Sequence, residues 1–101
     1  MKAARLTSPK HFEILETETP TAQDGQCLIK LERVSVCGSD IRHGFQVNPE
    51  EMYPMDFGTP CHELAGVVVE SRTDAFQEGQ RAIVIPQQGT GGLVEYIVSD
   101  P

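Results

Sequence analysis

Apolar and polar positions alternate over short stretches of this chain, and Gly, Pro or Asn residues separate the stretches. Alternation with a period of two is typical of β-strands that bury one face. The pattern predicts an opening hairpin from residues 2–6 and 12–16, and further strands at residues 64–70, 81–85 and 93–98. Many short strands with little helical signal favour a mostly β fold, namely a small, partly open antiparallel β-barrel.

The strand that begins at Cys27 changes phase part-way along. Cys27, Ile29 and Leu31 share one face of this strand, but the next apolar residue is Val34. An extra residue in a strand, a β-bulge, produces such a shift because side chains alternate from face to face. We therefore expect a bulge that redirects the strand just before Cys37.

Helical signal is scarce, and one or two short helices are expected. Ser39 or Asp40 is a suitable N-cap for a short helical turn that runs to about His43 and ends at Gly44. The following residues, 45–60, contain three prolines and are predicted to form a long irregular loop. A loop of this length is usually functional, so its apolar side chains would line part of a pocket or pack onto the barrel.

Length and charge narrow the classes of function. The 101 residues suit one domain, residues 1–101. The net charge of −7 repels phosphate backbones, so no nucleic-acid partner is expected. No apolar stretch approaches the roughly 18 residues of a membrane span, and the start lacks the apolar core of a signal peptide. We therefore expect a cytoplasmic protein without membrane contact. Its three cysteines, an odd number, argue against a disulfide framework.

Two short segments offer side chains that bind metals. Residues 37–40 read Cys-Gly-Ser-Asp at the end of a predicted strand, and residues 60–63 read Pro-Cys-His-Glu where the next strand begins. A thiol, an imidazole and carboxylates together suit Zn²⁺, whose catalytic sites use about three protein ligands and one open position. Taken singly, each of these residues also suits a structural role, the cysteine as a small buried side chain and the histidine as a packed one.

The order of these segments resembles the catalytic-zinc pattern of the medium-chain alcohol dehydrogenases. Four further stretches resemble the same family in the same order: residues 1–3, 66–70, 78–81 and 91–96. The chain is therefore similar to the amino-terminal, GroES-like catalytic domain of a zinc-dependent medium-chain dehydrogenase. The resemblance implies a GroES-like barrel and NAD(P)-linked oxidation of a small alcohol, polyol or sugar to a carbonyl.

The resemblance also implies a role for each site residue. Cys37 and His62 would be zinc ligands, and Glu63 would be a third ligand or one that exchanges with water. Asp40 would accept a hydrogen bond that orients His62. Ser39 would take the proton of the substrate hydroxyl and relay it outward.

Three positions depart from the family pattern. Cys61 stands where a glycine usually precedes the His-Glu pair, and it is expected to be a partly buried thiol. Arg42 stands where many members continue the proton relay with a histidine, and it is expected to face solvent. The four-cysteine lobe that many members carry after Pro86 is absent, so one catalytic zinc and no structural zinc are expected.

The sequence contains no G-x-G-x-x-G fingerprint after a strand. No cofactor-binding residue is therefore expected in this chain, and NAD or NADP would bind only through a Rossmann domain that is absent from it. The glycine-rich residues 89–92 open no helix and are expected to form a flexible turn. The isolated 101-residue chain is predicted to be inactive, and a homo-oligomer is expected only for the full-length form.

Two other functions remain open on these residues. The chain would alternatively be a free-standing GroES-like module that binds zinc or docks on a partner without redox activity. A zinc-free quinone reductase half of the same superfamily is disfavoured by the combination of Cys37 with His62 and Glu63.

Overall fold

The computed structural model describes residues 1–45, 48–87 and 89–101. Strands dominate, as the alternation of apolar and polar residues predicts. The elements in chain order are β1 (Lys2–Ser8), β2 (His11–Glu16), β3 (Cys27–Ser35), α1 (Gly38–Phe45), the 3₁₀ turn η1 (Glu50–Met52), β4 (Glu63–Ser71), β5 (Arg81–Val84) and β6 (Tyr96–Ser99).

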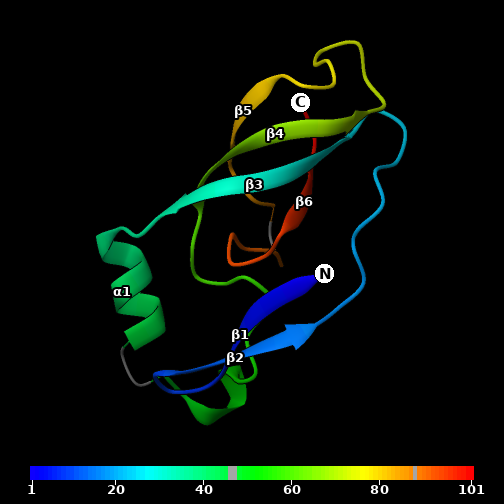
Figure 1. The fold of residues 1–101 in the computed structure, drawn as a ribbon. Helices are drawn as coiled ribbons and strands as arrows, with labels where there is room; N and C mark the ends of the chain where they lie inside the picture. The colour runs from blue at the N-terminus through cyan, green and yellow to red at the C-terminus, as the bar shows by residue number, and fades with distance from the viewer. Residues whose placement is uncertain (46–47, 88) are drawn as a thin grey trace.

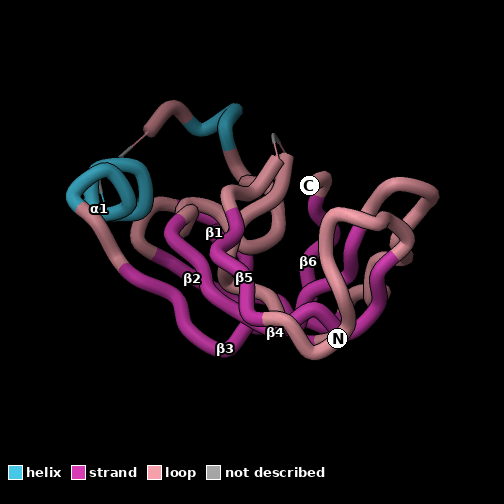
Figure 2. The backbone as a smooth tube through the Cα atoms, turned by 90° about the horizontal axis from the view of Figure 1, so that it is seen from above, coloured by secondary structure: helices cyan, strands magenta, loops and turns pink. Residues whose placement is uncertain are grey.

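The strands form two sheets, and every strand pair is antiparallel. β1 and β2 make the predicted hairpin, and the second sheet has the order β5-β4-β3-β6 (Figure 1). Seen from above, α1 lies at one side of the molecule, away from both chain termini (Figure 2). Within the described residues both sheets remain open at their edges, which agrees with the predicted mostly β, partly open GroES-like architecture.

The hydrophobic core lies on the inner face of the larger sheet. Each of its side chains contributes roughly 1.5–3 kcal/mol by leaving water. The buried members come from all four strands of the sheet: Cys27, Ile29, Leu64, Val68, Val84 and Ile97. Because β3 and β4 supply four of these six residues, the core fixes the two strands whose ends carry the candidate metal ligands.

The predicted bulge in β3 is present. Leu31 pairs with Gly66 and Arg33 pairs with Ala65, so Glu32 is the extra residue that has no partner in β4. A second irregularity, near Leu28, was not expected from the sequence.

The last strand begins later than predicted. β6 starts at Tyr96, whereas the apolar pattern begins at residue 93. The residues before it bond elsewhere: Val94 forms an isolated bridge with Ala3, and the carbonyl of Leu93 accepts the N–H of Ala4 at 2.8 Å. These residues pair with β1 and so connect the two sheets.

The prediction of the helix ends was wrong in detail. α1 begins at Gly38, so Cys37 takes the cap position and the predicted caps, Ser39 and Asp40, lie inside the first turn. Asp40 still stabilises the helix start, because its Oδ2 accepts the N–H of Cys37 at 3.0 Å, the return half of a capping box. The helix continues past Gly44, which is buried.

The predicted loop at residues 45–60 contains the 3₁₀ turn η1, and Gln46 and Val47 lie outside the described residues. Part of this loop packs onto the hairpin. Met55 is buried and its N–H donates to the carbonyl of Leu6 at 3.0 Å, while the guanidinium of Arg5 lies 4.6 Å from the centre of the Phe57 ring.

Candidate metal centre

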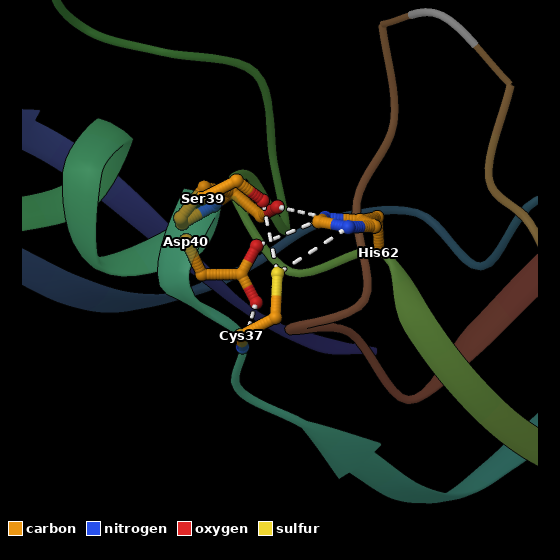
Figure 3. A network of polar contacts seen from close by, with 5 residues as sticks. Cys37, Ser39, Asp40 and His62 are labelled. Carbon is orange, nitrogen blue, oxygen red and sulfur yellow. Dashed lines mark hydrogen bonds and ion pairs between the residues drawn. The ribbon is translucent and has the colours of Figure 1, made fainter.

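The two segments with metal-binding side chains meet at one end of the larger sheet. β3 and β4 are antiparallel neighbours, and Ser35 at the end of β3 pairs with Glu63 at the start of β4. Residues that follow β3 therefore lie beside residues that precede β4. Figure 3 shows the outcome, with the side chains at the start of α1 facing His62.

The sulfur of Cys37 lies at the centre of this group. Its Sγ atom is 2.9 Å from Oγ of Ser39 and 3.5 Å from Nε2 of His62. Cys37 and Ser39 are half-buried, whereas His62 is exposed. The thiol thus contacts both a hydroxyl and an imidazole, with access to solvent on the histidine side.

Asp40 is the buried charged side chain of the site, with only 2% of its surface exposed. One carboxylate oxygen, Oδ2, accepts the N–H of Cys37. The other, Oδ1, lies 2.9 Å from Nδ1 of His62, but this contact lacks hydrogen-bond geometry, and no described residue donates a hydrogen bond to it. The same Nδ1 lies 3.3 Å from the carbonyl oxygen of Pro60. Because an unsatisfied buried carboxylate oxygen is costly, a metal cation bound beside this carboxylate would be stabilised.

The residues present fit a zinc ion. One donor atom from each of Cys37, Asp40 and His62 lies within 4.8 Å of the other two. Tetrahedral zinc, with Zn–S of about 2.3 Å and Zn–N of about 2.0 Å, places sulfur and nitrogen roughly 3.5 Å apart. The observed separation of Sγ and Nε2 is 3.5 Å. A thiol–imidazole hydrogen bond has a similar length, so the argument depends on the donor set of sulfur, nitrogen and carboxylate oxygen.

Four of the five predicted site residues come together, and one does not. Cys37, Ser39, Asp40 and His62 form the network of Figure 3. Glu63 is exposed at the first position of β4 and is not among the residues whose donor atoms converge. Its role as a ligand stays a prediction.

Cys61, which replaces the usual glycine, is buried with 4% of its surface exposed. Burial raises the pKa of its thiol, and the electrostatic influence of Asp40 and then of Cys37 raises that pKa further. The thiol is therefore neutral at physiological pH, and it does not belong to the converging donor group.

Sequence reasoning missed the contacts that hold the backbone beside His62. Gly58 has a φ of +84°, and a Cβ atom on it would overlap the backbone carbonyl of Gly91. The N–H of Gly92 donates to the carbonyl of Cys61 at 2.8 Å. Gly91 and Gly92 are buried, so this part of the expected flexible turn is packed. The adjacent glycines 91 and 92 were the sequence signal for this contact, because a glycine lets two backbone segments approach closely.

The proposed outer relay position is occupied by Arg42, which is exposed on α1, as expected. The side chains of its neighbours His43 and Phe45 lie outside the described part of the chain. Among the described residues, no helix is long and apolar enough to cross a membrane.

Comparison with known sequences finds one protein family and several relatives. The alcohol dehydrogenase GroES-like domain matches residues 23–100. An uncharacterized zinc-type alcohol dehydrogenase-like protein of Haemophilus influenzae is 36% identical over 89 residues, which cover 85% of this chain and 25% of that protein. The zinc-type alcohol dehydrogenase-like protein YdjJ of Escherichia coli is 38% identical over 88 residues, covering 82% of this chain and 25% of that protein. The chain thus spans about a quarter of the length of these relatives.

Solved structures show the same fold. The 2R,3R-butanediol dehydrogenase of Bacillus subtilis superposes with a TM-score of 0.77 at 25% identity, covering 98% of this chain and 38% of that one. An Escherichia coli oxidoreductase/dehydrogenase of unknown specificity superposes with a TM-score of 0.76 at 27% identity, covering 99% of this chain and 38% of that one.

Proposed function

Since this chain belongs to the family of alcohol dehydrogenase GroES-like domains, we propose that it is the zinc-binding catalytic domain, at the amino-terminal end, of a zinc-dependent dehydrogenase. The single observation that supports this most is the convergence of Cys37 and His62 in front of the buried Asp40 carboxylate. The reaction we propose is NAD(P)-linked oxidation of a small alcohol, polyol or sugar to a carbonyl.

Cys37 through Sγ and His62 through Nε2 would hold the zinc ion, and Glu63 would be the third or exchangeable ligand. Zinc bound there supplies Lewis-acid chemistry, which makes a substrate hydroxyl more acidic. The carboxylate of Asp40 lies beside Nδ1, the other ring nitrogen of His62. Asp40 would therefore hold the ring with Nε2 turned toward Cys37. The proposal includes one catalytic zinc and no structural zinc.

Ser39 would handle the proton in this reaction. Its Oγ lies 2.9 Å from the sulfur of Cys37, so a hydroxyl group sits next to the metal donors. A serine hydroxyl both donates and accepts, and it can therefore take a proton from the substrate and pass it to solvent. With Arg42 at the outer position, the next acceptor would be water, because a guanidinium does not give up its proton.

A nicotinamide cofactor would accept the hydride. The described residues include no glycine fingerprint and no helix that follows such a turn. We therefore place NAD or NADP on a Rossmann domain outside residues 1–101, and we propose that this chain alone does not turn over an alcohol.

Metal analysis of the 101-residue chain tests the site. The chain is expected to bind one zinc ion, weakly because it offers at most three ligands. Cys37→Ala and His62→Ala should each lower zinc affinity by about tenfold or more, and Cys37→Ala should also remove the thiolate-to-metal absorption band when Co²⁺ replaces Zn²⁺.

His11→Ala is the matched control, because His11 is an exposed histidine at the start of β2. This variant should bind zinc like the parent chain. Full zinc occupancy in the Cys37→Ala, His62→Ala double variant would show that the metal binds elsewhere.

A further inference from the structure

We propose that the outer face of the four-stranded sheet carries a binding site for a phosphoryl group, formed by Arg33 and Arg81 with Lys30 beside them. This site is separate from the candidate metal centre and does not depend on the proposed dehydrogenase function. Three of the chain's 8 basic residues lie on this face, which also carries Glu32 and, at the start of β4, Glu63.

The register of the strands places these cations on the same face. Lys30 of β3 pairs with Val67 of β4, which pairs with Arg81 of β5. Residues in register on neighbouring strands point to the same side of a sheet. Two positions earlier on β4, Ala65 points to the same side as Val67 and pairs with Arg33 of β3. Arg33 reaches the face of Lys30, three positions earlier, only because the bulge at Glu32 inserts one residue between them.

A depression of about 390 Å³ lies between the two arginines. Ala65 and the exposed Ile83 face it between Arg33 and Arg81, and Gly66 and Ala82 border it. β3 and β5 are two strand spacings apart, about 10 Å, and the long side chains on either side can therefore lean over the same anion.

The charges of this face are not neutralised by the protein. Within the described residues, none of Lys30, Arg33 and Arg81 takes part in an ion pair. Arg33 uses one guanidinium nitrogen, Nη1, to donate to the carbonyl of Glu32 at 2.8 Å, which leaves its other N–H groups available. Glu32, whose carboxylate is negative, also borders the depression. A singly charged anion would therefore gain little binding energy there.

These features fit a phosphoryl group better than a carboxylate. The forked N–H groups of a guanidinium bind phosphate oxygens in pairs, and a phosphate near neutral pH carries more than one negative charge. Two guanidinium groups with an ammonium group beside them match that charge and outweigh the single carboxylate of Glu32. Inorganic phosphate and a phosphate monoester share this chemistry.

Titration of the ¹⁵N-labelled chain with inorganic phosphate, at constant ionic strength, tests the proposal. Saturable amide shifts are expected in β3, β4 and β5 around Arg33, Gly66 and Arg81. Arg33→Gln and Arg81→Gln should each weaken phosphate binding by about tenfold, the loss expected for hydrogen bonds to a charged group. A parallel titration with glycerol 3-phosphate distinguishes the sources, since tighter binding of the ester would assign the site to an organic phosphate and equal or weaker binding to the free ion.

Arg42→Gln is the matched control, because it removes the same charge from an exposed position on α1. It should leave the phosphate affinity within twofold of the parent. Equal shifts with chloride at the same ionic strength, or equal weakening by Arg42→Gln, would overturn the proposal. So would a change in oligomeric state of the Arg81→Gln variant without any effect of phosphate, because that result would assign the face to a protein contact.

Discussion

At the scale of single residues, Asp40 links the local fold to the candidate chemistry. One of its oxygens holds the N–H of Cys37 at the start of α1, and the other faces the ring of His62. The sulfur and the imidazole come from segments far apart in the sequence, and this carboxylate contacts both segments, at the backbone N–H of Cys37 and at the ring of His62. Because Asp40 is buried, few water molecules screen its carboxylate from the ring of His62.

Substituting Asp40 separates its two tasks. Asp40→Asn keeps an oxygen that can accept the N–H of Cys37 but removes the negative charge next to His62. Zinc affinity should therefore fall by about 10–100-fold while the circular dichroism spectrum is unchanged. Ser39→Ala, its comparison variant, should leave zinc affinity within about twofold, because Ser39 is proposed to act on the proton. Parental zinc affinity in Asp40→Asn, measured by competition with a chelator, would contradict the positioning role.

At the scale of elements, the sequence predicted what depends on periodicity and missed what depends on tertiary contact. The phase shift after Leu31 correctly predicted the bulge, because a period of two leaves no other simple explanation. The helix start was placed too late, because Ser39 and Asp40 are good caps in isolation and only the contact with Cys37 assigns Asp40 to the first turn.

The candidate site shows the same division. The residue types at 37–40 and 60–63 indicated the chemistry, and the pairing of β3 with β4 brings four of the five residues together. The position of Glu63, exposed and apart, could not be derived from its place beside His62 in the sequence. The contact of Gly58 with Gly91 lacked any periodic signal, because it involves only backbone atoms of two distant loops.

That backbone contact can be tested with two glycines of equal φ. Gly25 and Gly58 both have a φ of +84°, but a Cβ atom on Gly25 would meet nothing within 4 Å. Gly25→Ala should cost about 1–2 kcal/mol of unfolding free energy, the strain of a left-handed alanine. Gly58→Ala should cost about 2–5 kcal/mol, because overlap with Gly91 adds to that strain. Urea denaturation measures both, and equal losses would show that the loops can move apart.

At the scale of the whole molecule, the chain provides one side of a proposed reaction centre. It spans about a quarter of the length of its curated relatives. The described residues supply candidate metal donors and a candidate proton acceptor, but they contain no glycine fingerprint for a dinucleotide. Hydride transfer needs the two carbons held about 3–3.5 Å apart, and such placement can supply roughly 7–11 kcal/mol of the barrier.

The isolated 101-residue chain is therefore expected to show no saturable binding of NAD or NADP in calorimetry and no turnover with alcohols. The net charge of −7 adds repulsion toward a dinucleotide. The phosphoryl site proposed on the sheet face predicts at most weak contact through a phosphate, which Arg81→Gln would weaken further. Binding tighter than about 100 μM with a stoichiometry near one, and unchanged in Arg81→Gln, would place a cofactor site within this chain.

The open edges of the larger sheet bear on how the chain behaves in concentrated solution. β5 is an edge strand of this sheet. In it, Ile83 has 87% of its surface exposed, and Ile85, just after it, has 81% exposed. An exposed edge strand with apolar side chains can pair with the same strand of another molecule and so promote aggregation. In this acidic chain, mutual repulsion is the restraint on such growth. Acidification toward the isoelectric point, about pH 4.8, neutralises that repulsion, so colloidal stability would fail before the core itself unfolds.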